Sequence, residues 1–229
     1  MENRNHYNLL ANIFRYPDEN YKLNAKKCED MLIANYPQIY LEAMPFFKFI
    51  KEEHLFKIEE VFSMTFHIQA ICFLDLGYVL FAEDYKRGEF LVKIKDEQRQ
   101  VGNDCGNELA DNLPNVLTLM TKMKDLDFLD EFASRIMKPA LGKMLEEFDL
   151  ARIELKNKVR MKKQKVLLVP NLENRNIYQY AIQGLLSVVN EDFKSMVYND
   201  PKIIPTLGGD FIKNCSTGCA TVETQPIKK

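Results

Sequence analysis

The chain has 229 residues, of which 46% are hydrophobic and 28% charged, and its formal net charge is −2. A chain of this length can bury one good core, so a single domain is the leading interpretation. The near-balanced charge argues against bulk electrostatic attraction to nucleic acid or anionic lipid. Glycine and proline are few, with nine of each, and abundant Leu, Lys, Glu and Met favour helices over an all-β sandwich.

Cysteine usage and the N-terminal residues bear on the compartment. The five cysteines are an odd number scattered along the chain, which predicts no secreted disulfide framework. The N-terminal residues are charged and develop no apolar signal region. No stretch approaches the roughly 18 uninterrupted apolar residues of a membrane span. We therefore expect a cytoplasmic protein without stable membrane insertion.

In the first part of the chain, prolines mark the expected helix boundaries. Proline favours the first turn of a helix and disfavours a helical conformation for the residue before it. The first helix must therefore end before Pro17, which opens the second helix, and Pro45 is expected to bend the third. The predicted helices here cover 2–15, 17–35 and about 38–53, followed by one that begins near Leu55.

The stretch 62–82 is the most apolar of the chain. Its apolar residues nearly encircle a helix, which predicts one central, buried helix. Gly77 within it costs about 1 kcal/mol relative to Ala, so we expect a close helix crossing there. A polar turn is predicted at 83–88, where Glu83 and Asp84 are expected to face solvent.

Polar loops and capped helices alternate in the second part of the chain. Asp111 or Asn112 is expected to cap a helix that has Pro114 in its first turn, and Asp125 and Asp127 are expected to cap the next. The predicted elements are a helix over 88–101, a loop over 102–114, and helices over 127–137, 139–163 and 176–196.

These patterns predict an all-α, compact single-domain bundle of about nine or ten helices. The domain is expected over 1–199, and residues 200–229, rich in Pro, Gly, Ser and Thr, are expected to form a flexible or docking tail. The segment 156–165 carries six basic residues. We interpret it as a solvated helix end, with a patch for an acidic partner as the alternative.

Residue clusters of the kind that enzymes need are missing. The histidines, at 6, 54 and 67, share no metal-ligand spacing, and neither a phosphate-binding glycine loop nor a G-x-S-x-G motif is present. Cys215 and Cys219 could supply half of a zinc site, but no second pair follows. We therefore predict no catalytic residues, no metal site and no cofactor. The 15 Phe, ten Tyr and ten Met are assigned mostly to the core, with an apolar peptide-binding groove as the alternative.

Three motifs in a fixed order are more specific. They are Thr65-Phe66 before the apolar stretch, D-Y-K-R-G at 84–88, and E-L-A-D-N-L-P at 108–114. Together they resemble the TorD/DmsD/NarJ group of molybdoenzyme assembly chaperones, and most of all the NarJ type that serves respiratory nitrate reductase. The family pattern reads roughly T-F-D, an apolar helix, D-x-R-G-x-x-L-V and then E-L-P-D-H/Y-L-P.

Weaker parts of the resemblance extend over about 1–190. A first helix closed by Tyr16-Pro17 and an N-x-Y pattern at 176–178 also match the family. The chain departs from the pattern at three positions. His67 stands where the family usually has Asp, Ala110 where it has Pro, and Asn112 where it often has His.

The resemblance implies a TorD-like helical fold and a protein that is not an enzyme. Such a protein binds the catalytic (alpha) subunit of a nitrate-reductase-like molybdenum enzyme, often through its N-terminal segment. It holds that subunit competent for insertion of the molybdenum guanine dinucleotide cofactor and blocks premature assembly or export. Nitrate reductase, nitrite oxidoreductase and their relatives are possible clients, and the chaperone is expected to be a monomer or homodimer.

A groove rimmed by acids could receive a client peptide with apolar and basic residues. Glu108 and Asp111 would pair with its cations. The expected client-contacting residues are Tyr85, Glu108, Asp111, Asn112, Leu113 and Val116. The expected turn-shaping residues are Asp84, Arg87, Gly88 and Pro114, with Gly88 permitting a close approach. For all of them, turn-building or capping without client contact stays the alternative. A helical scaffold or regulator for another partner is the rival function.

Overall fold

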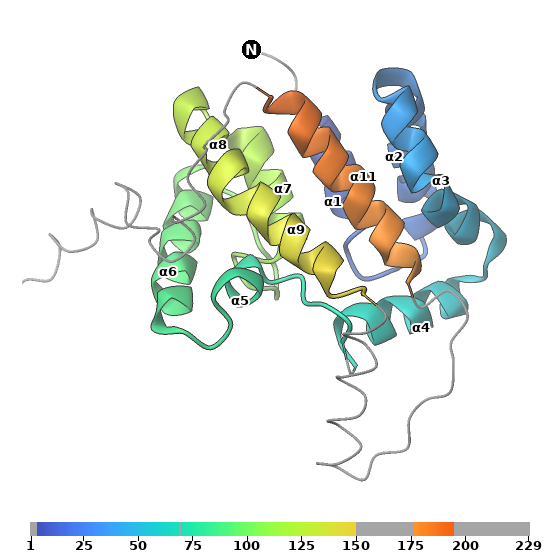
Figure 1. The fold of residues 1–229 in the computed structure, drawn as a ribbon, viewed down its shortest axis with the longest axis horizontal. Helices are drawn as coiled ribbons and strands as arrows, with labels where there is room; N and C mark the ends of the chain where they lie inside the picture. The colour runs from blue at the N-terminus through green and yellow to red at the C-terminus, as the bar shows by residue number, and fades with distance from the viewer. Residues whose placement is uncertain (1–3, 69, 150–175, 195–229) are drawn as a thin grey trace, which may run out of the picture. The chain divides into compact units, whose positions relative to one another are not determined.

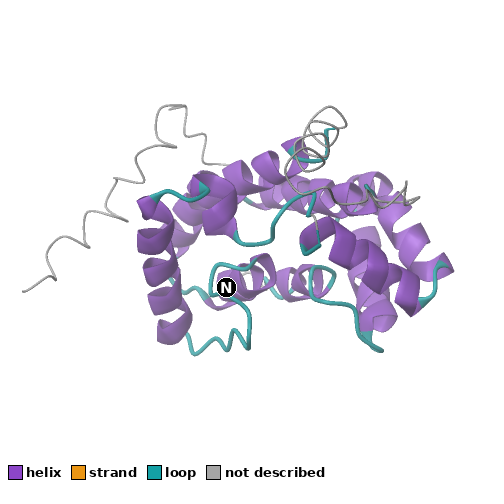
Figure 2. Ribbon diagram, turned by 90° about the horizontal axis from the view of Figure 1, so that it is seen from below, coloured by secondary structure: helices purple, strands orange, loops and turns teal. Residues whose placement is uncertain are grey.

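The computed structural model describes residues 4–68, 70–149 and 176–194. Over these ranges the protein is all-α, as predicted, and Figure 2 shows helices joined by loops without a strand. The predicted tail over 200–229, the basic segment 156–165, and Cys215 and Cys219 lie outside the described residues. The elements are α1 (His6–Asn12), α2 (Tyr21–Asn35), α3 (Pro37–Glu52), α4 (Leu55–Phe66), α5 (Leu76–Phe81), α6 (Tyr85–Gln100), α7 (Leu113–Lys122), α8 (Leu126–Phe132), the π-helical turn η1 (Ala133–Met137), α9 (Lys138–Glu146) and α11 (Ile177–Asp192).

Helix α11, the last described element, packs in the middle of the bundle. It lies between α3 and α9, and α1 packs against α2 and α7 (Figure 1). A Cβ added at Gly184 of α11 would lie 3.0 Å from the Cβ of Ala43 on α3, so this glycine allows the two helices to pack closely. Among the described helices, none is long and apolar enough to cross a bilayer.

The core is rich in aromatic rings, as predicted, and Tyr178 of α11 is at its centre. Its ring lies 5.2 Å from that of Phe46, 5.6 Å from Phe62 and 5.0 Å from Phe66. Tilted and edge-to-face pairs at these separations are favourable. Its hydroxyl lies 2.9 Å from that of Tyr21, which also donates to the backbone oxygen of Ile13 at 2.7 Å. These contacts join α2, α3, α4 and α11.

The predicted helix over 62–82 is wrong. Helix α4 ends at Phe66, and α5 begins only at Leu76. The described part of the segment between them is half buried and irregular, because its backbone bonds to the end of α4 and to the start of α7. The N–H of Ile71 reaches back to the oxygen of Thr65 at 2.8 Å, and Leu74 accepts the N–H of Leu113 at 2.9 Å. The apolar pattern therefore predicted the burial of Ala70, Ile71, Cys72 and Leu74 correctly, but Ile68 and Phe73 are exposed and the predicted helical conformation is wrong.

Two further boundaries differ from the predictions. Helix α2 begins at Tyr21 and not at Pro17, because Asp18 forms a turn in which its side chain accepts the N–H of Asn20 at 2.9 Å. Helix α6 begins at Tyr85 and not at 88, because the side chain of Asp84 caps it by accepting the N–H of Lys86 at 2.8 Å. Glu83 and Asp84 are exposed, as expected.

The two helices predicted over 127–137 and from Pro139 form one continuous element, α8–η1–α9. Asp125 caps its start by accepting the N–H of Phe128 at 3.0 Å, whereas Asp127 lies in the first turn. Proline lacks an N–H and normally interrupts a helix. Here a π-helical turn precedes it, with the N–H of Lys138 bonded to the oxygen of Ala133, so the helix continues.

Candidate functional site

Residues from the resembling motifs meet at one cleft, which we call the motif cleft. It has a volume of about 270 Å³ and lies between the end of the N-terminal segment, α4, the loop 105–112 and the start of α7. Its buried floor includes Phe14, Phe62, Leu74 and Pro114, and its exposed rim includes Arg15, Tyr16, His67 and Glu108. The cleft thus combines an apolar floor with a polar and charged rim.

Three rings form one wall of the motif cleft. The ring of Tyr16 stacks on that of His67 with centroids 6.2 Å apart and an interplanar angle of 8°. The ring of Phe62 is nearly perpendicular to both, with its centroid 5.6 Å from that of Tyr16 and 5.4 Å from that of His67. His67, the departure from the family's aspartate, is therefore a ring-stacking residue here. Within the described residues neither Tyr16 nor His67 makes a side-chain hydrogen bond.

Next to the cleft, two loops are joined by the residues Asp75 and Asn112, of which Asn112 lines the cleft. Asp75 and Asn112 form an isolated antiparallel bridge, and the side-chain amide of Asn112 donates to Asp75 at 3.1 Å. The N–H of Leu76 donates to the backbone oxygen of Asp111 at 3.0 Å. Asn112 occupies the N-cap position of α7, as predicted, but its side chain bonds across to Asp75 and does not cap the helix.

Asp111 is an interior residue, with 1% of its surface exposed. Its Oδ2 accepts the N–H of Gly77 at 2.8 Å, so it caps the start of α5 from a distant loop. Its Oδ1 has no hydrogen-bond partner among the described residues. Burial raises the pKa of this carboxyl, and the nearby charge of Asp75 raises it further, while the Gly77 N–H and the Arg87 charge lower it.

The residues predicted to contact the client are partly buried and partly exposed. Of the expected client contacts, Asp111, Leu113 and Val116 are buried, so this conformation does not present them to a client. Glu108 lies on the rim of the motif cleft, and Asn112 lines it. Tyr85 is 81% exposed, but it lies on α6 outside the cleft. Client contact by Tyr85 and Glu108 therefore stays a prediction.

No protein-family model and no curated protein sequence matches the chain. The motif cleft must therefore be interpreted from its own residues.

The residues predicted to shape the turn have distinct places. Asp84 caps α6, and Pro114 lies in the first turn of α7. The guanidinium of Arg87 lies over the ring of Tyr78, 5.1 Å from its centroid. The expected close approach at Gly88 is wrong, because a Cβ there would meet nothing within 4 Å.

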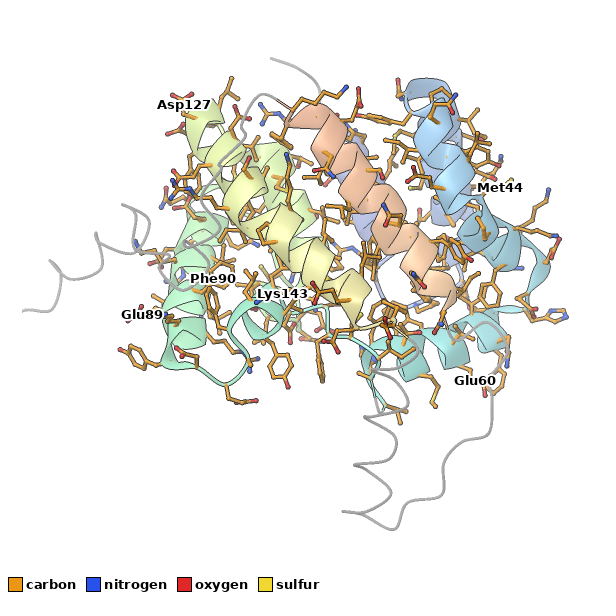
Figure 3. All side chains as sticks on the ribbon, in the orientation of Figure 1. Met44, Glu60, Glu89, Phe90, Asp127 and Lys143 are labelled. Atoms are coloured by element: carbon orange, nitrogen blue, oxygen red, sulfur yellow. The ribbon has the colours of Figure 1, made fainter. Side chains whose placement is uncertain are left out.

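The close approach lies at Gly77 instead. An added Cβ there would be 2.7 Å from Asp111 Oδ2 and 3.0 Å from Phe90 Cδ1. Figure 3 shows Phe90 on the inner side of α6 and Glu89 on its outer side. The predicted crossing at Gly77 is thus a contact with the loop of Asp111 and with α6.

A buried polar network missed by the sequence analysis holds the loop that carries Glu108. The side-chain amide of Gln98 donates to the oxygen of Ala110 at 2.9 Å, and that of Asn115 donates to the oxygens of Cys105 and Leu109 at 3.2 and 3.0 Å. Gln98 continues the buried face of α6, eight residues after Phe90. A lone amide on an apolar helix face is the signal that could have found it.

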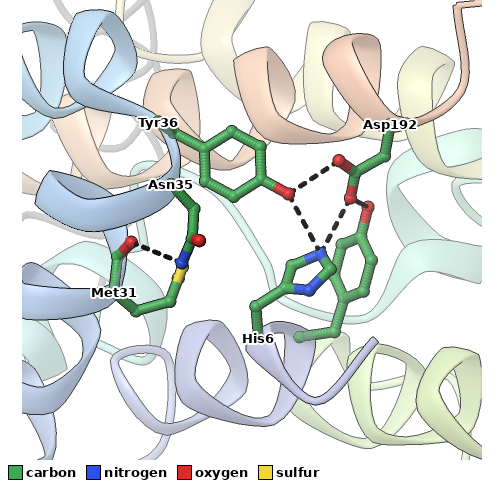
Figure 4. Close-up of polar contacts among 6 residues, drawn as sticks. His6, Met31, Asn35, Tyr36 and Asp192 are labelled. Atoms are coloured by element: carbon green, nitrogen blue, oxygen red, sulfur yellow. Dashed lines mark hydrogen bonds and ion pairs between the residues drawn. The ribbon is translucent and has the colours of Figure 1, made fainter. Parts of the chain in front are cut away.

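A second, larger cleft of about 960 Å³ lies at the end of α11 and was also missed. There Asp192 accepts hydrogen bonds from His6 Nε2 at 2.8 Å, Tyr7 Oη at 2.8 Å and Tyr36 Oη at 2.7 Å (Figure 4). Burial by itself would raise the pKa of Asp192, but the three donors outweigh it and the pKa is lowered. This cluster joins α1 and α11 to Tyr36, the residue between α2 and α3.

The motif cleft combines charged or titratable side chains with an apolar floor. No group of three or more His, Cys, Asp or Glu side chains that could hold a metal ion occurs among the described residues. The rim offers Arg15, His67 and Glu108 as charged or titratable groups around an apolar floor. Such a surface can bind a peptide side chain and its charged neighbours.

Proposed function

We propose that the chain is a cytoplasmic chaperone for the catalytic subunit of a nitrate-reductase-like molybdenum enzyme, such as nitrate reductase or nitrite oxidoreductase. It binds a segment near the N-terminus of that subunit and assists insertion of the molybdenum cofactor. It then releases the subunit for assembly or export. It carries no catalytic residues or cofactor of its own, and it works as a monomer or homodimer.

The observation that carries this proposal is the convergence of distant motifs on the motif cleft. Tyr16 and Glu108 come from two separate parts of the resemblance, and both are exposed on one rim together with His67, which follows the Thr65-Phe66 motif at a position where the chain departs from the family pattern. Exposed side chains gathered around an apolar floor support a binding role.

The size of the motif cleft supports a peptide as the ligand. Pockets for drug-sized ligands and cofactors have volumes of roughly 300–1,000 Å³, and this cleft has about 270 Å³. One or two side chains of a peptide fill such a space, whereas a dinucleotide cofactor exceeds it. We therefore assign the client polypeptide to this cleft, and not its cofactor.

Binding of the full chain to the catalytic subunit tests the proposal. Pull-downs use the apo and the cofactor-loaded subunit, and calorimetry uses a peptide of its N-terminal segment. Tyr16→Ala is expected to weaken binding about tenfold or more, as truncation of an interface tyrosine does. Tyr180→Ala is the matched control, because Tyr180 is an exposed tyrosine of α11 that does not line the cleft.

Two outcomes would count against the chaperone. The first is no interaction with the subunit in either state. The second is salt-sensitive binding to a different, acidic partner that depends on the basic segment 156–165 and not on Tyr16. That second result would favour the rival function, a helical scaffold or regulator.

A further inference from the structure

The rim of the motif cleft carries two opposite charges that do not pair. Arg15 and Glu108 are both exposed and both line the cleft. Neither side chain makes a hydrogen bond or ion pair with any described residue, so they do not neutralise each other. Opposite charges on one rim can each meet a charge of a bound segment.

Arg15 and Glu108 are the charged rim residues of the described structure that can pair with a ligand. The side-chain amides of Asn112 and Asn115 are occupied by hydrogen bonds to Asp75 and to the loop 105–109, whereas the exposed amide of Asn107 also lines the cleft but carries no charge. Asp111, the second acid expected to meet client cations, is buried away from the rim. Among the described residues, the rim therefore carries one carboxylate and one guanidinium without a partner, and it is not the acid-rimmed groove that the sequence suggested.

The apolar floor and the stacked rings favour one large apolar side chain in the ligand, between the charges that face Arg15 and Glu108. Phe14, Phe62, Leu74 and Pro114 form a buried apolar floor, and the stacked rings of Tyr16 and His67 flank it. Burial of one large apolar side chain here removes its surface from water and packs it against aromatic faces. At about 270 Å³ the space holds one such anchor, not an extended apolar run.

We propose, building on the proposed function, that the motif cleft recognises a dipolar client segment. The segment places one large apolar side chain on the floor, a basic residue toward Glu108 and an acidic residue toward Arg15. A segment with basic residues on both sides of the anchor binds less well, because Arg15 repels one of them. The rim charges thus fix the direction in which the segment lies, and they discriminate against polybasic partners.

Synthetic 15-residue peptides test this inference on the full chain by fluorescence anisotropy. One has a central Phe with Lys on its N-terminal and Glu on its C-terminal side, a second has the charges exchanged, a third has Lys on both sides, and a fourth replaces Phe by Ala. One of the two dipolar peptides is expected to bind best. Replacing its Phe by Ala should weaken binding of the peptide about tenfold to a hundredfold, because burial of a large apolar side chain contributes free energy of that order.

Charge-reversed proteins give the decisive comparison. Glu108→Lys and Arg15→Glu are each expected to weaken the preferred peptide about threefold to tenfold, in the range of exposed ion pairs. The double variant Arg15→Glu/Glu108→Lys should prefer the peptide with exchanged charges. Because both side chains are exposed and unpaired in the described structure, the thermal unfolding midpoint should stay unchanged. Glu83→Lys, at an exposed acid outside the cleft, is the control.

Dipolar recognition and the chaperone function can fail independently in these experiments. Equal binding of all charge patterns, a preference for the peptide with two Lys, or no binding of any peptide overturns the dipolar recognition. If the catalytic subunit still binds wild type and fails to bind Tyr16→Ala, the chaperone proposal survives that result. If the dipolar peptide binds and the subunit does not, the recognition stands and the proposed client is wrong.

Discussion

Asp111 Oδ2 accepts the backbone N–H of Gly77 at 2.8 Å, and a Cβ added to Gly77 would lie 2.7 Å from that same oxygen. The carboxylate therefore occupies the space that a side chain would need. This contact joins the loop before α7 to the start of α5, across 34 positions of sequence. Asp111 directly precedes Asn112, which pairs with Asp75 and lines the motif cleft, so this contact also helps to hold the wall of the cleft in place.

Replacing Gly77 with Ala is expected to destabilise the protein by about 1–3 kcal/mol. The new methyl group meets the carboxylate of Asp111 and the ring of Phe90, and overpacking of a filled core costs free energy of this order. The free energy of unfolding is measured by urea denaturation. Gly88→Ala is the matched control, because its Cβ meets nothing within 4 Å and Ala stabilises a helix by about 0.5–1 kcal/mol. Equal effects of the two substitutions would contradict the close approach.

Removing the carboxylate of Asp111 leaves the buried N–H of Gly77 without a partner. Asp111→Ala is expected to cost about 1–3 kcal/mol, whereas Asp111→Asn retains an oxygen acceptor and should cost less. Because the folded-state pKa of Asp111 is raised, the neutral carboxyl favours folding below the ordinary value of 3.8. That contribution is lost as pH rises through the folded pKa.

The sign of this linkage gives a second measurement. Wild type should gain stability relative to Asp111→Asn as pH falls from about 7 to about 4. Urea denaturation of both proteins across this range tests it. A difference that is constant with pH, or that changes in the opposite direction, would show that Asp111 does not titrate as its burial requires.

The hydrogen-bonded pair of Tyr21 and Tyr178 should respond asymmetrically to loss of a hydroxyl. The Tyr21 hydroxyl donates to Ile13, so Tyr178 must be the donor between the two rings. Tyr21→Phe therefore leaves both a buried donor and a buried acceptor unpaired, whereas Tyr178→Phe leaves only an accepting oxygen without its donor. Thermal unfolding should show a larger loss for Tyr21→Phe, by about 1 kcal/mol or more. The reverse order would contradict this donor assignment.

Much of the fold was predictable because helix boundaries depend on local chemistry. Pro37 and Pro114 lie in the first turns of their helices, and Asp125 caps α8. The failures share a different cause. Residues 67–75 carry an apolar run that a buried helix and a buried loop satisfy equally, and contacts with a loop more than 30 positions away decided between them. The periodicity of apolar residues in a single sequence carries no information on contacts between such distant segments.

The sequence motifs indicated which segments form the candidate site, but they did not indicate which of their residues are exposed. Glu108 and Asp111 are three positions apart in one motif, yet one is exposed and the other is buried beneath the start of α5. Arg15 lay in no motif, and it reached the rim only because the segment after α1 folds beside the loop 105–112. Which side of a loop faces water is a tertiary property.

Asp192 is expected to contribute acid-sensitive stability at the end of α11. Hydrogen bonds from His6, Tyr7 and Tyr36 lower its pKa despite burial. A lowered folded-state pKa gives stability that is fully present above the ordinary value of 3.8 and lost as pH falls through the folded value. Asp192→Asn should therefore cost about 1–3 kcal/mol at neutral pH, because hydrogen bonds to a charged group are worth this much.

The pH dependence distinguishes this charge effect from a loss of packing. The difference in unfolding free energy between wild type and Asp192→Asn should be largest near neutral pH and shrink below about pH 4. Asp130→Asn is the control, because Asp130 lines the same cleft and its side chain makes no hydrogen bond with the described residues. Tyr7→Phe removes one donor without removing the charge and should reproduce part of the loss at neutral pH. A loss from Asp192→Asn that persists unchanged in acid would mean that the carboxylate acts through its shape and not through its charge.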